Sequence, residues 1–177
     1  MNHWGITGWK PNWINTPDEL LAQLITNFPI GKTISRTISL RDEEGWFSDA
    51  PVIISIDGVN HEFCATKIGE YSYTRNSIDI SAPVNWCEEP NGKGTLHWQE
   101  SAIPEMQLFE GKVVDKVGVV EHLLDESIQE IFQQSWVLAG VFFVSNDLHL
   151  EIYNALDCNG VVNAKKSISG LRYRSSA

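Results

Sequence analysis

Val52–Phe63, with the sequence VIISIDGVNHEF, carries the strongest local structural signal in the chain. An Asp-Gly pair between two runs rich in β-branched residues favours a two-residue hairpin turn, because both turn residues need positive φ angles. The resulting register places three pairs on one face: Ile56 with Val59, Ile54 with His61, and Val52 with Phe63. The stretch therefore predicts antiparallel strands, with His61 on their apolar face as a core histidine.

Other segments are also typical of strands. Residues 34–40 alternate apolar and polar side chains, and residues 71–81 are expected to supply a further strand. Residues 137–153 predict a closing hairpin around Ser145-Asn146-Asp147, whose first strand is apolar on both faces and is expected near the centre of a sheet. In that register Phe143 shares a face with His149, Glu151 and Tyr153.

Two segments predict helices. Thr16 is a candidate N-cap, Pro17 suits the first helical position, and Glu19 completes a capping box ahead of an apolar stripe. Residues 118–134 carry apolar side chains at helical spacing, and their opposite face is polar and mostly acidic. We therefore expect an α+β fold, a mainly antiparallel sheet of about five to seven strands with two main helices packed on it.

The chain is expected to form a single domain over residues 1–177, because 177 residues is an ordinary domain length. A Trp-rich irregular segment occupies residues 1–15, and a basic tail is expected from about residue 164 to residue 177. The cysteines Cys64, Cys87 and Cys158 are odd in number and share no short spacing, which favours reduced thiols in a cytoplasmic protein. A bridge between two of them stays open.

The charge balance narrows the classes of partner. Thirteen Lys and Arg against twenty-three Asp and Glu give a net charge of −10, which argues against binding nucleic acid or an anionic membrane and suits a basic partner. No apolar run is long enough to span a membrane, and no secretory signal is visible. The carboxylates all lie within residues 1–157, which carry −14, whereas the tail carries +4.

No established catalytic signature is present, so we expect a protein that is not an enzyme and has no cofactor and no metal. Gly92-Lys93-Gly94 lacks the rest of a phosphate-binding loop and predicts a turn. His149 and Glu151 share a strand face beside Tyr153, which leaves open a small-molecule enzyme or ligand-binding site near these three residues.

Acidic clusters with nearby tryptophans are the candidate partner-binding residues, because charge complementarity speeds encounter and aromatic side chains anchor interfaces. These candidates come from two loops and from the acidic face of the predicted helix 118–134. They are Asp42, Glu43, Glu44, Trp46, Trp86, Glu88, Glu89, Glu121, Asp125, Glu126 and Glu130.

The order of these elements resembles small acidic immunity proteins of bacterial polymorphic and contact-dependent toxin systems, in particular the Imm1-like group. The resemblance covers residues 16–134 and rests on four strings: TPDELL (16–21), the hairpin through Phe63, GEYSY (69–73) and IPE (103–105). It implies a protein without catalytic activity that binds a cognate toxin and occludes a surface the toxin needs.

The leading hypothesis is therefore a cytoplasmic, non-enzymatic binding protein, an immunity protein that neutralises a basic bacterial toxin. A small-molecule site near His149, Glu151 and Tyr153 is the second hypothesis. The third is a structural or oligomer-forming protein that docks its Trp-rich N-terminus on a neighbouring chain.

Overall fold

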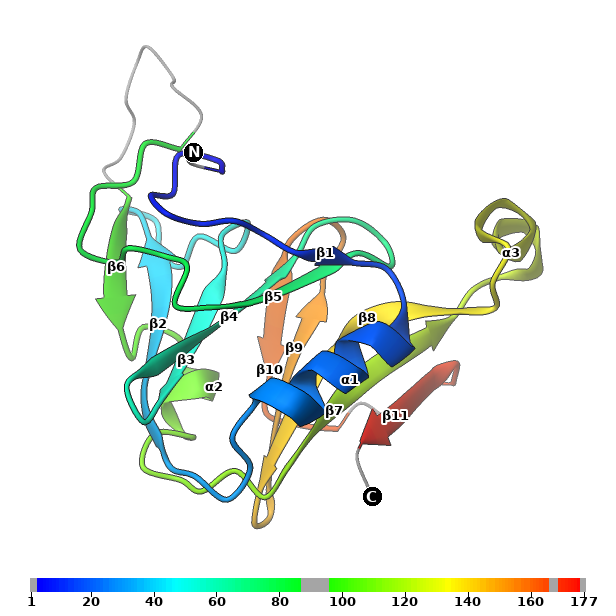
Figure 1. The fold of residues 1–177 in the computed structure, drawn as a ribbon. Coiled ribbons are helices and arrows are strands. Elements are labelled where there is room, and N and C mark those ends of the chain that lie inside the picture. Colours follow the sequence, from blue (N-terminus) through cyan, green and yellow to red (C-terminus); the bar gives the residue numbers. More distant parts are fainter. Residues whose placement is uncertain (1–2, 87–95, 166–168, 176–177) are drawn as a thin grey trace.

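The computed structural model describes residues 3–86, 96–165 and 169–175, which form eleven strands in two antiparallel sheets and three helices. The six-stranded sheet has the order β1-β5-β4-β3-β2-β6 and the five-stranded sheet the order β10-β9-β8-β7-β11 (Figure 1). The first sheet contains β1 (Trp13–Ile14), β2 (Ile34–Arg41), β3 (Val52–Ile56), β4 (Val59–Ala65), β5 (Tyr71–Arg75) and β6 (His97–Glu100). The second contains β7 (Lys116–Leu123), β8 (Trp136–Ser145), β9 (Leu148–Asn154), β10 (Asn159–Val162) and β11 (Leu171–Ser175). The helices are α1 (Pro17–Asn27), α2 (Pro104–Gln107) and α3 (Glu126–Phe132).

The Asp-Gly hairpin is confirmed. Asp57 and Gly58 both have positive φ angles, and the three predicted pairs between β3 and β4 are the observed ones. The first helix is confirmed as well, since it begins at Pro17 and the Thr16 side chain accepts a hydrogen bond from the Glu19 backbone N–H at 3.4 Å. Local signals of turn and cap chemistry therefore decide these two elements.

The expected α+β fold, with two main helices on one sheet, is wrong. Residues 118–134 do not form a helix, because the chain runs as strand β7 and then as the seven-residue helix α3. Valines at positions 117, 119 and 120 fit helical spacing and a buried strand equally well, and β-branched side chains favour the strand. The fold is mostly antiparallel β-sheet, with more strands than predicted.

One apolar core is shared by both sheets. Phe63 of β4 meets Phe143 of β8 edge to face, and Leu20 and Leu24 of α1 join the same core beneath the helix. Tyr71 also crosses between the sheets, since its buried hydroxyl donates to the Ile152 carbonyl oxygen at 3.2 Å. The helix and the two sheets therefore close around a single apolar layer.

A second apolar cluster covers the other face of the six-stranded sheet. Trp9 is buried there, and the half-buried rings of Trp4, Trp13 and Trp86 pack around it or around one another. The Trp-rich N-terminal segment is thus part of the packed body in its described residues. The aromatic rings at this end shield strand residues such as Ile53 from water.

Buried polar side chains fasten the sheets to loops. Asn159, at the start of β10, donates to the Ser48 and Ala50 carbonyl oxygens at 3.1 and 2.8 Å and accepts from the Ala65 backbone N–H at 2.8 Å. One side chain of the second sheet thereby holds β4 and the β2–β3 loop of the first. Each of these bonds is shielded from water, so the amide cannot be exchanged for an apolar group without leaving unpaired atoms.

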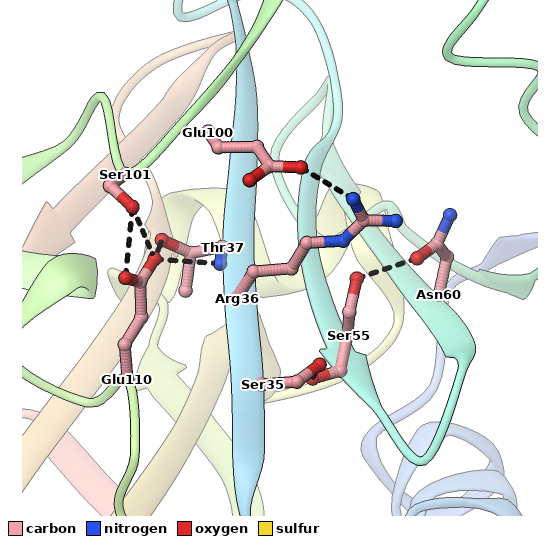
Figure 2. Close-up of polar contacts among 8 residues, drawn as sticks. All are labelled: Ser35, Arg36, Thr37, Ser55, Asn60, Glu100, Ser101 and Glu110. Atoms are coloured by element: carbon pink, nitrogen blue, oxygen red, sulfur yellow. Dashed lines mark hydrogen bonds and ion pairs between the residues drawn. The ribbon is translucent and has the colours of Figure 1, made fainter.

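Glu110 performs a similar role at the irregular strand β2, whose register shifts between Ile34 and Arg36. Its carboxylate accepts from the Thr37 backbone N–H and hydroxyl at 2.8 and 2.7 Å, and from the Ser101 hydroxyl (Figure 2). Arg36 pairs with Glu100 of the edge strand β6 beside it. The Thr37 backbone N–H, which lies just beyond the end of the β2–β6 pairing at Ile38, is satisfied by Glu110 in this way.

The expected basic tail is instead the edge strand β11, which pairs with β7. Arg172 and Arg174 both bond to the carboxylate of Glu121, which is fully buried. Arg174 also pairs with Asp18 at the start of α1. Two of the four bases of the tail are therefore paired with a carboxylate of the preceding residues.

Replacing Glu121 with Gln tests this cluster. The neutral amide leaves two arginines facing each other without their shared counter-charge, so the free energy of unfolding should fall by about 2 kcal/mol. This value is smaller than for a fully buried ion pair, because both guanidinium groups are partly exposed. Chemical denaturation measures the change. Glu126→Gln on exposed α3 is the matched control and should stay within about 0.5 kcal/mol. Equal losses for the two variants would contradict the pairing.

His61 gives a pH prediction. Its Nδ1 lies 2.9 Å from the Tyr73 hydroxyl oxygen, and burial, with a smaller effect of Arg75, lowers the pKa of His61 to about 4. The unfolded chain therefore binds a proton between pH 6.5 and 4 that the folded chain excludes, and stability is lost as the pH falls through this window. His61→Phe should remove roughly 2 kcal/mol of the loss between pH 7 and 4.5. Parallel pH profiles for variant and wild type would refute this.

Candidate functional site

The hairpin β8–β9 has a different register from the predicted one. The turn contains only Asn146-Asp147, and Ser145 pairs with Leu148. Phe143 consequently faces the core opposite Leu150, and the expectation that it shares a face with His149, Glu151 and Tyr153 is wrong. A turn shorter by one residue moves every side chain of one strand to the other face. The expected central place of β8 in its sheet is confirmed.

A buried polar cluster occupies the face of the second sheet that points away from the core. Glu151 is almost completely buried, and its Oε2 accepts from the Tyr173 hydroxyl of β11 at 2.9 Å. The same oxygen lies 3.8 Å from His149 Nε2, and Phe142 stacks on the His149 ring. Burial, with a smaller effect of Lys165, lowers the pKa of His149.

Glu151 and Tyr153 also line a groove of about 370 Å³ that lies between α3, the ends of β7 and β8, and the β9–β10 turn. We call it the α3 groove. Its apolar lining includes Ile68, Leu124, Ile128, Val137, Leu156 and Leu171. The carboxylates that line it are those of Asp125 and Glu151, and His122 is the remaining ionisable ring apart from the Tyr153 phenol. His149 does not line the groove.

Local chain geometry holds the α3 groove open. Strand β7 ends at Leu123, and the Leu124 backbone N–H donates to the Ser135 carbonyl oxygen at 2.8 Å, which fixes both ends of the α3 segment. Gln129 donates to the Leu124 carbonyl oxygen at 2.6 Å from within α3. On the opposite wall, Asn154 donates to the Lys67 carbonyl oxygen at 2.6 Å and ties the β4–β5 loop to the end of β9.

Gly69 brings that loop close to the second sheet. Its φ angle is +78°, and an added Cβ would lie 3.4 Å from the Val137 Cβ. A larger residue would therefore need both an unfavourable backbone conformation and a shift of the groove wall. The neighbouring Ile68 side chain consequently faces the solvent beside the groove while the backbone packs against it.

The structure places the predicted partner-binding residues in several separate groups. Glu121 is buried and ion-paired, so it is withdrawn from any contact surface. Asp125, Glu126 and Glu130 are exposed on the α3 segment, and Asp125 lines the groove.

Asp42, Glu43 and Glu44 lie in the β2–β3 loop, where the Asp42 carboxylate accepts from the Glu44 and Gly45 backbone N–H groups at 2.8 and 2.9 Å. Trp46 is half-buried against the shared core, and Trp86 packs edge to face against Trp4 and Phe47. Glu88 and Glu89 lie outside the described residues. Strands β2 and β6 and the helix α3 stand on opposite sides of the molecule, so the acidic residues of the β2–β3 loop do not form one patch with Asp125 (Figure 1).

Most groove residues were missed by the sequence analysis, among them the two exposed apolar residues Ile68 and Leu156. Leu156 lies in a polar turn between Asn154 and Asn159, and its side chain is 81% exposed. An isolated apolar residue in such a turn is the one signal that could have indicated it, because single exposed apolar residues are otherwise ordinary.

In the part of the chain that the structure describes, no three or more His, Cys, Asp or Glu side chains are grouped so that they could hold a metal ion. Cys64 and Cys158 are both free thiols, and burial raises the pKa of Cys64 to about 12. Cys87 lies outside that part. None of the described helices has both the length and the apolar character needed to cross a membrane.

Comparison with known proteins gives no relative to set beside this site. The chain matches no protein-family model, and neither the curated proteins nor the solved structures contain a significant match.

Proposed function

We propose that the protein is a non-enzymatic binding protein whose α3 groove receives an apolar, positively charged segment of a basic protein. The observation that carries the proposal is the combination within one hollow of apolar walls and carboxylates. Leu156, Ile68 and Ile128 supply apolar contacts, and Asp125 lies among them. A segment with an apolar side chain and a neighbouring Lys or Arg would satisfy both kinds of lining.

Apolar surface supplies the affinity in this proposal. Leu156 and Ile68 are strongly exposed without a partner, and covering apolar surface is favourable by about 25 cal/mol per Å². Anchors of this kind dominate binding energy when the surrounding contacts exclude water. The groove also has a floor of buried side chains, including Val137 and Leu138, so an inserted side chain would meet packed atoms on several sides.

Charge supplies selectivity. The exposed carboxylates of Asp125, Glu126 and Glu130 surround the same helix, and the chain as a whole carries −10. A basic partner would be attracted from a distance and an acidic competitor repelled, mainly through the rate of association. Binding should therefore weaken as the salt concentration rises.

We further propose that the basic partner is a toxin and that the protein acts in the cytoplasm as its immunity protein. The support is the acidic character of the groove and the resemblance of TPDELL (16–21), the hairpin through Phe63, GEYSY (69–73) and IPE (103–105) to small acidic immunity proteins. The helix expected over residues 118–134 does not support it, because β7 and α3 occupy that range. The toxin would be inhibited by occlusion. The part of the toxin that binds α3 and the β9–β10 turn would no longer be accessible to other molecules. The free thiols of Cys64 and Cys158 are consistent with a reducing compartment.

A small molecule with a cationic group is a second candidate occupant of the α3 groove. It is favoured by Glu151, a buried carboxylate that reaches the groove lining and is oriented by the Tyr173 hydroxyl. A compound of low mass that stays with the purified protein in native mass spectrometry would support this candidate over a protein partner.

Leu156→Lys is the direct test of the groove. The change removes an exposed apolar anchor and places a positive charge where a basic partner would bind, so affinity should fall at least about tenfold. Leu108→Lys is the matched control, since Leu108 is also an exposed leucine, at 55%, and lies outside the groove. Both variants change the net charge equally. The measurement is capture from a lysate of the native source, followed by titration of the captured protein.

The proposal predicts a captured protein of basic pI that wild type and Leu108→Lys bind alike. In cells that express the captured protein, wild type should restore growth and Leu156→Lys should not. Equal binding by the two leucine variants would refute the groove as the contact surface. A concentration-dependent dimer that Leu156→Lys dissociates would instead assign the groove to self-association.

A further inference from the structure

A second hollow, of about 540 Å³, lies between α1 and the end of β5. Its chemistry is opposite to that of the α3 groove, because most of its lining side chains are polar and Arg75 is its one charged group. Gln23 and Asn27 come from α1, whereas Arg75 and Asn76 come from β5 and the turn that follows it. We call this the Arg75 hollow.

Two carboxylates contact residues that line the Arg75 hollow. The Gln23 side chain of α1 donates to Glu19 Oε1 at 3.5 Å. Glu62 is almost completely buried, and the backbone N–H groups of Ser77 and Ile78 donate to its Oε1 at 2.7 and 2.8 Å. The hydroxyls of Thr74 and Ser77 both donate to its Oε2. Four internal donors therefore satisfy this anion, and the turn wrapped around it presents Arg75 and Asn76 to the outside.

Arg75 forms no ion pair with any residue in the described part of the chain, although the protein carries an excess of carboxylates. Its cross-strand neighbour is His61, which is buried and uncharged at neutral pH. Asn76 accepts the Asn60 backbone N–H through its Oδ1 at 2.8 Å, which leaves its NH2 group as a donor at the hollow. The hollow thus combines one guanidinium, one amide donor and the Asn27 amide oxygen across from them.

We propose that the Arg75 hollow binds a small hydroxylated organic anion, with its carboxylate or phosphate on the Arg75 guanidinium and its hydroxyls on the amide side chains. Guanidinium pairs with carboxylate and phosphate through two parallel hydrogen bonds. The amides of Asn27 and Asn76 offer both acceptors and donors, as hydroxyl groups require. This site is separate from the α3 groove and independent of the function proposed for it.

Isothermal titration calorimetry with three probes tests the site. Glucuronate supplies a carboxylate, glucose 6-phosphate supplies a phosphate, and glucose supplies the hydroxyls alone. At least one of the anions should bind at least about tenfold more tightly than glucose, because a charge-assisted pair is stronger than neutral hydrogen bonds. The preferred anion then identifies the charged group of the natural ligand.

Arg75→Gln removes the cation but keeps a polar side chain, and it should weaken binding of the preferred anion at least about tenfold. Arg75→Lys, which keeps the charge and loses the planar fork, should give an intermediate affinity. Arg41→Gln removes an arginine of the same sheet outside the hollow and should bind like wild type. Anions that bind no better than glucose, or equal affinities for Arg75→Gln and wild type, would overturn the proposal.

Discussion

The carboxylate of Glu121 lies buried between Arg172 and Arg174, and this contact determines where the last strand of the chain docks. A buried carboxylate without a counter-charge is strongly destabilising, so β7 can be a central strand only when β11 covers this position. Arg174 extends the same cluster to Asp18 of α1, so helix and edge strand are held from one point. Once β11 is in place, Leu171 stands beside His122 as a wall of the α3 groove.

The cluster also shows that part of the charge counted in the sequence is paired or buried in the fold. The four bases after residue 157 include the two arginines that neutralise Glu121, so half of the positive charge of this segment is paired at the β11 edge of the second sheet. Carboxylates at Glu62 and Glu151 are likewise buried and bonded to hydroxyl groups. The surface that remains is acidic at α3, where apolar side chains lie next to Asp125, and positively charged at the Arg75 hollow. Two contacts of opposite chemistry are thus kept apart on one small protein.

The elements that sequence could predict are those set by local chemistry. The Asp57-Gly58 turn requires positive φ angles, and Thr16 with Pro17 satisfies the requirements of a helix start, so neither depends on distant residues. The helix prediction for residues 118–134 was wrong because an apolar run rich in valine fits the period of a helix and that of a strand equally well. The arginines of β11 that pair with this segment as a strand lie some fifty residues away in the sequence. The predicted register of β8 and β9 was wrong because the turn is one residue shorter than expected, so Phe143 and Glu151 lie on opposite faces of the sheet.

The candidate site was predictable only in part. Glu151 and Tyr153 were paired correctly on one face, and Asp125 was identified from its charge. Ile68 and Leu156 lie in turns without periodicity, and their segments are brought together by long-range contacts such as the packing of Gly69 on Val137 and the bond from Asn154 to Lys67. Long-range contacts of this kind leave no pattern in a single sequence.

Hydrogen–deuterium exchange of the protein with and without its captured basic partner tests the central claim most directly, because it maps the covered backbone without a substitution. The account predicts slower exchange in α3, in the Lys67–Glu70 loop and in the turn around Leu156, with the strands beside Arg75 unchanged. Protection confined to the β2–β3 loop or to the Arg75 hollow, with α3 exchanging at its free rate, would contradict it.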